Sequence, residues 1–321
     1  MTTPRSVILT GTSSFVGAHL AASFAHAGWT VTATHGGDRA GYDGIRADRL
    51  RFAEQAGAAL TQLDITDGRA VHELAARVHP AVWVHHAGYA TNYAAPDYDH
   101  ALGDAINVAP LDAIFTAMAD TDGGVIITGS SAEYAASDQA NHEDETGEPE
   151  MPYGQSKKAE TERARVLSKQ TGVPVRVGRL YIPFGRLDHP AKLLAQVIEG
   201  LSAGQPIDLS ACTQRRDFIG VADVCDAWLK MADDLRRGGF DLFNICSGDA
   251  TELRSLLLEI AAAMTANPDL LRFGARGMRP GEAPVSYGDN SKAKTQLAWR
   301  PRDLARALRE DLLAVAAEAA Q

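Results

Sequence analysis

The fold is decided near the start of the chain by the stretch Val7-Ile8-Leu9-Thr10-Gly11-Thr12-Ser13-Ser14-Phe15-Val16-Gly17. It opens with a short apolar run that is typical of a buried parallel strand, and Leu20, Phe24 and Ala27 then recur with helical spacing. A strand, a glycine turn and a helix form the context in which a dinucleotide binds, because the first amides of the helix face the pyrophosphate. The stretch therefore predicts a dinucleotide site at the end of a parallel strand.

The glycines of this turn have separate predicted tasks. Gly11 permits the tight turn, and Gly17 lets the helix pack close to the strand. Ser14 replaces the usual middle glycine, and it weakens the motif without cancelling it because only a small residue fits there. The alternative is that this segment is an ordinary strand-to-helix turn that binds no cofactor. We predict that the cofactor contacts this segment at Gly11, Ser14, Phe15, Val16 and Gly17.

A second strand, predicted at residues 30–34, ends where the choice of cofactor is normally made. In NAD-preferring proteins an acid at this point accepts hydrogen bonds from the ribose hydroxyls and would repel a 2′-phosphate. Here the chain has His35, followed closely by Asp38 and Arg39. The missing acid favours NADP(H), with His35 and Arg39 as contacts, while Asp38 keeps NAD(H) open.

Two later strand ends and one helix start offer further cofactor contacts. Asp64, with Ile65, follows an apolar strand, and it either accepts from the adenine amino group or caps the helix that begins near Gly68. Ala87 and Gly88 end the next strand with small side chains, which let the backbone approach a cofactor. Asn107 either contacts the cofactor or caps a helix that has Pro110 in an early position.

His85 and His86 belong to the same strand end, and they invite a metal or general-base interpretation. Adjacent residues of a strand point to opposite faces, and no cluster of carboxylates accompanies these two. We therefore predict packing or supporting roles for both histidines and no metal site.

The catalytic candidates are Ser130, Tyr153 and Lys157. Tyr153 and Lys157 are spaced i, i+4, so their side chains share one helix face and can point into one cleft. A free tyrosine loses its proton only near a pH of about 10, and a fixed cation nearby favours the phenolate. Ser130 ends a buried apolar strand, where its hydroxyl can bond the oxygen of a carbon that exchanges hydride. The alternative is that Tyr153 and Lys157 are two surface residues of a helix without a catalytic role.

The composition limits the class of protein. With 321 residues the chain can form one large domain or two closely associated ones, and its net charge of -10 argues against nucleic acid as the main partner. Its 3 cysteines are widely spaced, which fits a reducing compartment and neither a disulfide framework nor a zinc site. No signal peptide or long apolar span is evident. We expect a soluble cytoplasmic protein without a membrane partner.

Together these motifs resemble the extended short-chain dehydrogenase/reductase family, in its NAD-dependent epimerase/dehydratase branch that works on nucleotide-activated sugars. The first-half motifs are Thr10-Gly11-x-x-Ser14-x-x-Gly17, Asp64-Ile65, His85-x-Ala87-Gly88, Ser130-Ser131-Ala132-Glu133-Tyr134 and Tyr153-x-x-x-Lys157. The second-half motifs are Arg216-Asp217-Phe218-Ile219-x-Val221-x-Asp223-Val224, Phe243-Asn244-Ile245-Cys246-Ser247-Gly248, Arg279-Pro280-Gly281-Glu282 and Ser291-Lys292 to Trp299-x-Pro301. The resemblance therefore covers nearly the whole chain.

The resemblance implies an α/β fold with a doubly wound parallel sheet (Rossmann fold) and a smaller C-terminal α/β substrate domain. The dinucleotide-binding domain would span residues 1–178, rejoined by residues 217–246, and the substrate domain residues 179–216 and 247–321. Ser131, Arg216 and Arg279 would bind the sugar nucleotide, the arginines at its diphosphate. The family also implies a homodimer, through the helices that carry Asn107 and Tyr153. Residues 304–320 are predicted to form a closing amphipathic helix.

The resemblance leaves the reaction to be chosen. A 4,6-dehydratase of this family usually has an Asp-Glu pair after the catalytic serine, where this chain has Ser131 and Ala132; Glu133 comes one position late, which on a strand turns it to the other face. The missing acid after the second strand favours a reductase, which exchanges NADPH each cycle, over a 4-epimerase, which retains NAD. We predict reduction of a nucleotide-linked 4-keto-6-deoxyhexose. The alternatives are a 4-epimerase, then a dehydratase or a non-catalytic NADP-binding redox sensor.

Overall fold

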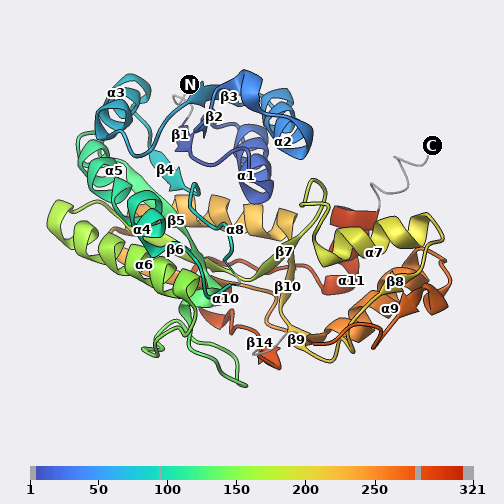
Figure 1. Ribbon diagram of the computed structural model, residues 1–321. Helices are drawn as coiled ribbons and strands as arrows, with labels where there is room; N and C mark the ends of the chain where they lie inside the picture. The colour runs from blue at the N-terminus through green and yellow to red at the C-terminus, as the bar shows by residue number, and fades with distance from the viewer. Residues whose placement is uncertain (1–4, 94, 279–282, 314–321) are drawn as a thin grey trace.

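The computed structural model describes residues 5–93, 95–278 and 283–313, and at its centre is a parallel sheet of seven strands (Figure 1). The strands lie in the order β11-β6-β5-β4-β1-β2-β3, and every neighbouring pair is parallel. Their bounds are β1 (Ser6–Leu9), β2 (Thr30–His35), β3 (Ala59–Gln62), β4 (Val82–His85), β5 (Gly124–Ser130), β6 (Val175–Leu180) and β11 (Phe240–Ile245). The predicted doubly wound sheet is confirmed.

Helices cover both faces of the sheet, and β1 shows why. Val7 and Leu9 pack into one apolar cluster with α1 and α8, whereas Ile8 packs into another with α3, α5 and α6. A strand without a polar face must be covered on both sides, because its side chains alternate between the two faces. The helices of this part are α1 (Phe15–His26), α2 (Gly44–Gln55), α3 (Gly68–Val78), the short α4 (His100–Gly103), α5 (Pro110–Ala119), α6 (Pro152–Thr171) and α8 (Val221–Asp234).

The order of the strands reverses between β1 and β4, which are neighbours in the sheet. In doubly wound sheets ligands bind outside the carboxyl ends of the strands at such a switch point. The turn of residues 10–17 follows β1, and Ala87 and Gly88 follow β4. Two of the predicted cofactor segments therefore lie where the topology creates a crevice.

A second group of elements packs around its own apolar cluster. Its strands are β7 (Ile182–Phe184), β8 (Ile207–Asp208), β9 (Arg215–Arg216), β10 (Phe218–Gly220), β12 (Thr251–Glu252), β13 (Leu271–Arg272) and β14 (Val285–Ser286), and its helices are α7 (Leu193–Ser202), α9 (Leu253–Ala263) and α11 (Leu304–Leu308). The short helix α10 (Ser291–Gln296) packs against β11 instead, and its Ala293 belongs to the apolar cluster of the large sheet. Between these segments the chain returns to the large sheet through α8 and β11, and β11 pairs with β6. The exact domain boundaries stay predictions.

The closing helix differs from its prediction. Within the described residues 304–313 it is α-helical over α11, and it continues as a π-helical turn, η6 (Arg309–Leu313). In that turn Glu310 and Asp311 reach back to Arg302, at 2.8 and 2.7 Å. These ion pairs hold the turn against the preceding loop, a constraint that an apolar periodicity does not reveal. Residues 314–321 lie outside the described part of the chain.

Candidate active site

A cavity of about 840 Å³ opens at the carboxyl ends of the sheet strands and extends to the second group of elements. Eight of the residues predicted to bind cofactor or substrate, or to catalyse, line it: Ser14, Gly88, Asn107, Ser130, Ser131, Tyr153, Lys157 and Arg216. They come from positions between 14 and 216, so the fold brings distant motifs to one surface.

The turn after β1 has the shape of a dinucleotide cradle. Gly11 has a φ of +79°, and a Cβ on it would lie 2.8 Å from the backbone nitrogen of Ala87. A Cβ on Gly17 would lie 2.3 Å from the carbonyl oxygen of Gly11. Ser14 begins α1 as its N-cap, and its Oγ accepts from Gly17 N at 3.0 Å. These residues fit a dinucleotide motif, because the two glycines let the turn pack against the segment after β4 and let α1 begin close to the end of β1.

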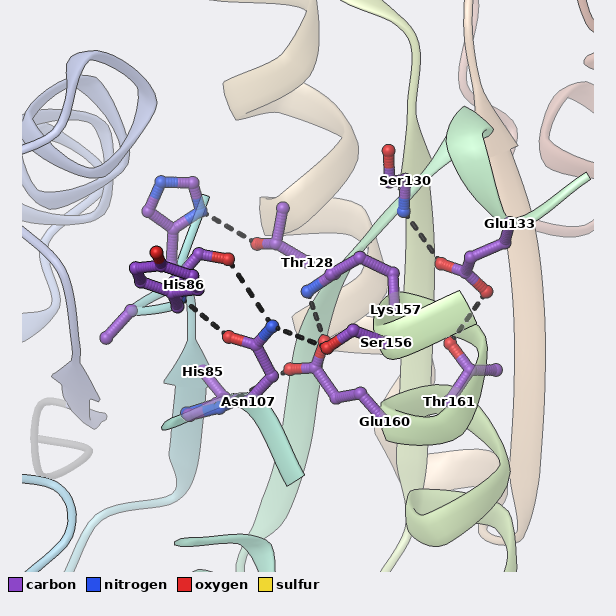
Figure 2. A network of polar contacts seen from close by, with 12 residues as sticks. His85, His86, Asn107, Thr128, Ser130, Glu133, Ser156, Lys157, Glu160 and Thr161 are labelled. Carbon is purple, nitrogen blue, oxygen red and sulfur yellow. Dashed lines mark hydrogen bonds and ion pairs between the residues drawn. The ribbon is translucent and has the colours of Figure 1, made fainter. Parts of the chain in front are cut away.

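His86 ties this cradle to the catalytic strand. Its Nε2 lies 2.9 Å from Ser14 Oγ. Its Nδ1 lies 2.9 Å from Thr128 Oγ1 on β5 (Figure 2). Burial lowers the pKa of His86 to about 4, so the ring is neutral at physiological pH. A neutral ring that bridges two hydroxyls supports the site, in line with the supporting role predicted for it.

Asn107 lines the cavity from a π-helical turn, η2 (Asp104–Val108), that precedes α5. Its Oδ1 accepts from Tyr89 N at 2.7 Å, and its Nδ2 donates to Ser156 Oγ at 3.0 Å (Figure 2). It therefore links the segment after β4 to α6, and its alternative role as a helix N-cap is wrong.

The residues predicted to hold the far end of the cofactor lie away from this cavity. Asp64 Oδ1 accepts from Thr66 N at 2.9 Å, and Asp67 caps α3, so the capping alternative for Asp64 is wrong. His35 is buried at the end of β2 with Nδ1 2.8 Å from Gly37 O, and Arg39 lies in the turn η1 (Arg39–Gly41), 3.7 Å from Glu54. Their contact with a cofactor stays a prediction.

Tyr153, Ser130 and Lys157 come together at the start of α6. Tyr153 lies in the first turn of this helix, and Ser130 is the last residue of β5. Gly154 allows α6 to approach the turn that follows β5, because a Cβ on it would lie 2.0 Å from the carbonyl oxygen of Ala132. A side-chain hydrogen bond with Ser130 and the charge of Lys157 both act on the Tyr153 phenol. The three predicted catalytic groups therefore share one site.

Lys157 has a partner that the sequence analysis did not predict. Its Nζ donates to Glu160 Oε2, and Glu160 Oε1 lies 3.4 Å from His85 Nε2 (Figure 2). Glu160 and His85 are almost wholly buried, with side chains 1% and 0% exposed. Burial lowers the pKa of His85 to about 3 and raises that of Glu160 to about 7. Burial also tends to lower the pKa of Lys157, but the pull of Glu160 and Tyr153 raises it above its ordinary value.

The net effect on Tyr153 corrects one expectation. Burial raises the pKa of the phenol, Lys157 lowers it, and Glu160 raises it again; the result lies above the ordinary value of 10.0. The cation does act in the predicted direction. Burial of the phenol raises the pKa of Tyr153 by more than Lys157 lowers it, and the buried carboxylate of Glu160 acts against Lys157.

The loop after Ser130 also differs from its prediction. Residues 131–133 form a single turn of 3₁₀-helix, η3 (Ser131–Glu133), so the strand alternation expected for Glu133 does not apply. Glu133 is buried, and its carboxylate accepts from Ser130 N at 2.7 Å, Thr161 Oγ1 at 2.9 Å and Arg179 Nε at 2.9 Å. It turns away from the cavity, as predicted, but for a different reason.

The substrate end of the cavity carries cations. Arg216, on β9, lines it, and its contact with a diphosphate stays a prediction; Arg276 and Gln214 line the cavity without having been predicted. Arg276 belongs to a loop with no local motif, so only the folded chain brings it near Arg216. Arg279 lies outside the described residues.

Several other properties of the described residues bear on the site. None of their His, Cys, Asp and Glu side chains form a group of three or more that could hold a metal ion. No helix among them is long and apolar enough to cross a membrane. Cys212, Cys225 and Cys246 are all buried.

Comparison with known proteins agrees with this geometry. The family model described as "NAD dependent epimerase/dehydratase family" matches residues 7–246. The chain belongs to this family. The predicted membership of the extended short-chain dehydrogenase/reductases that modify nucleotide sugars is thereby confirmed.

Relatives of this epimerase/dehydratase-family chain include enzymes of different reactions. CDP-abequose synthase of Salmonella muenchen is 30% identical over 122 residues, which are 38% of this chain and 41% of the relative. The dTDP-4-dehydro-6-deoxyglucose reductase of Escherichia coli is 26% identical over 177 residues, 52% of this chain and 53% of the relative. The chain thus matches about half or less of the length of these relatives. The UDP-glucuronic acid 4-epimerase of Bacillus cereus, solved with UDP-glucuronic acid and NAD, shares the fold at a TM-score of 0.82, with 18% identity over 98% of this chain and 99% of that one.

Proposed function

We propose that the protein is an NAD(P)-dependent oxidoreductase that reduces the 4-keto group of a nucleotide-linked 6-deoxyhexose. The observation that carries this proposal is the convergence of Ser130, Tyr153 and Lys157 in a cavity that continues to Arg216 and Arg276. Such a cavity offers proton transfer at one end and fixed cations for a diphosphate at the other. A sugar joined to a nucleotide by a diphosphate has both features.

The side chains divide the work. The bound cofactor would supply a hydride to the carbonyl carbon. Tyr153 donates its proton to the carbonyl oxygen, which becomes the hydroxyl of the product, and it regains a proton from solvent afterwards. Ser130 donates a hydrogen bond to the same oxygen and so fixes its position. Lys157 stabilises the negative charge that Tyr153 carries between these two steps.

The residues beside Ser130 favour reduction over dehydration. Ser131 and Ala132 line the cavity at the positions where the dehydratases of this family have acids. Neither side chain can donate or remove a proton at the sugar's C6 near neutral pH. Glu133 is the next acid along the chain, and its carboxylate already accepts hydrogen bonds from Ser130 N, Thr161 and Arg179. The site therefore has the groups for carbonyl reduction and lacks the elimination pair.

We propose NADP(H) as the cofactor. Asp38, the acid that kept NAD(H) open, accepts from Ala40 N at 3.1 Å as the cap of η1. Arg39 follows it in the chain, and Arg46 Nη2 reaches Ser13 Oγ at 3.4 Å, so one guanidinium group lies beside the cofactor turn and a second lies at the end of β2. Arginine suits the 2′-phosphate because its planar fork bonds phosphate oxygens in pairs. Arg39→Ala should weaken NADPH binding about tenfold and leave NADH binding unchanged; Arg51→Ala, on the exposed side of α2, is the control.

The test of the reaction supplies a nucleotide-4-keto-6-deoxyhexose with NADPH and follows the loss of NADPH absorbance. Tyr153→Phe should reduce kcat by roughly 10²–10⁴-fold and keep the Kd for NADPH. Tyr93→Phe is the matched control, because that ring also lines the cavity, 5.8 Å from the Tyr153 ring. If NADPH is not consumed and a pair of 4-epimeric sugar nucleotides is interconverted without added cofactor, the protein is an epimerase and the proposal fails. A Tyr153→Phe variant with full activity would contradict the assignment of the proton donor.

Two further points complete the proposal. We infer a homodimer through α5 and α6, as the resemblance to the family implies; Val166 of α6 is an apolar side chain that is 42% exposed. We also infer a cytoplasmic location, in line with three buried and widely spaced cysteines. Sedimentation at micromolar concentration tests the first point, and fractionation of the producing cell tests the second.

A further inference from the structure

Glu160 stands in an unusual place for a carboxylate. It lies one helical turn after Lys157 on the buried face of α6, and it contacts the amine on which the proton chemistry of Tyr153 depends (Figure 2). Its side chain is 1% exposed, so water cannot weaken the interaction. The cation beside the phenol is therefore largely offset by an anion on its other side.

The charged and titratable groups around Glu160 come from three elements. They are Lys157 and Tyr153 on α6, His85 on β4, and Glu133 on η3. His85 is neutral, and Glu133 is held by Arg179. Among the described residues, the opposite charges that act most directly on the Tyr153 phenol are thus those of Lys157 and Glu160.

We propose that Glu160 is a positioning residue that offsets the charge of Lys157 and so holds Tyr153 as a phenol, the form that donates a proton to a carbonyl oxygen. This inference rests on the proposed function, because it explains why the same site would favour reduction of the substrate over its oxidation. Reduction begins with the phenol. Oxidation of a sugar hydroxyl, which opens an epimerase or dehydratase cycle, begins with the phenolate. A carboxylate beside Lys157 therefore favours reduction over oxidation on the same catalytic set.

The direct test is the titration of Tyr153. Its phenolate absorbance is isolated by subtracting the spectrum of the same protein with Tyr153→Phe. In the wild type Tyr153 should ionise above pH 10, whereas in Glu160→Gln it should ionise roughly one to two pH units lower. Glu160→Asp keeps the charge and should restore the wild-type curve. Glu162→Gln, on the same helix but 53% exposed, is the matched control and should not move it.

Kinetics give the second readout. The alkaline limb of the pH profile for reduction should move to lower pH in Glu160→Gln by the same one to two units, and the reverse oxidation near neutral pH should become about tenfold faster. A purely structural role for Glu160 would lower both rates without moving the limb, and that result overturns the proposal.

The two proposals can fail separately. If wild-type protein reduces no keto sugar, the proposed function fails, while the titration still decides the role of Glu160. If Glu160→Gln does not fold, the wild-type titration decides alone, because ionisation of Tyr153 below about pH 8 shows that Lys157 is not offset. An unchanged curve in folded Glu160→Gln overturns the inference even in an active reductase.

Discussion

Gly154 offers the sharpest test of how the catalytic groups are assembled. It follows Tyr153 in the first turn of α6, where the helix meets the loop after Ser130. Ordinary contact for a Cβ begins at 3.4 Å, and a Cβ on Gly154 would lie 2.0 Å from the backbone oxygen of Ala132, so the helix must retreat by about 1.4 Å. A displacement of about 1 Å at reacting groups can cost about 10²-fold in rate. Gly154→Ala should therefore lower kcat by about 100-fold.

Stability gives a second and independent number for the same variant. Alanine is favoured over glycine inside a helix by about 1 kcal/mol, so propensity alone predicts a more stable protein. Overpacking against backbone costs about 1–3 kcal/mol and acts in the opposite direction. We expect the clash to prevail, and urea unfolding should give a lower midpoint with an unchanged slope. Gly41→Ala, which meets no atom within 4 Å, is the control. A Gly154→Ala protein that is both more stable and fully active would refute the contact on which the assembled site depends.

Three further predictions follow from buried or cationic groups. Glu133→Leu leaves Arg179 buried without its carboxylate, 2.9 Å away in the native chain, and should cost about 3–5 kcal/mol in the free energy of unfolding, measured in urea. Burial raises the pKa of Asp217 to about 6 from 3.8, so the stability it contributes is full below about pH 4 and is lost as pH rises through 6. Asp217→Asn should therefore lose less stability between these pH values than wild type, by up to roughly 3 kcal/mol, and an equal loss in both proteins would contradict the shift. Arg216→Ala should raise the KM for the sugar nucleotide about 10–100-fold with little change in kcat, since a diphosphate contact binds ground and transition states alike; an unchanged KM would place the diphosphate elsewhere.

The fold was predictable from sequence because its determinants are local. A strand buried on both faces appears as a continuous apolar run, and the glycine turn after β1 admits few alternatives. Gly11 and Gly17 were expected to permit close approach, and a Cβ on either would meet backbone within 3 Å. The return of the chain to the sheet through α8 and β11 was also predicted, but from the resemblance to a family. No local pattern specifies which edge a late strand will join.

The site was predictable in its reacting groups and less so in the charges behind them. Glu133 and Glu160 were not predicted to support the site, because glutamate side chains usually face water. A signal existed in both cases. Ser130 and Glu133 have the spacing of a capping box, and the structure forms one. Glu160 lies three residues after Lys157, so any argument that turns Lys157 into a cleft turns Glu160 toward the same buried face.

The same catalytic set has to serve reductases, epimerases and dehydratases, so tyrosine, lysine and serine alone cannot decide which half of a redox cycle runs well. In this chain we infer that the carboxylate of Glu160, one helical turn after Lys157, decides which half runs faster. An epimerase needs Tyr153 to act first as a base and then as an acid within one turnover, and Glu160 opposes only the first of these steps. If the substrate proves to be a 4-epimer pair, its oxidative half-reaction should therefore be the slow one, and Glu160→Gln should accelerate that half alone. A uniform effect on both halves would mean that the carboxylate holds Lys157 in place and leaves the ionisation of the phenol unchanged.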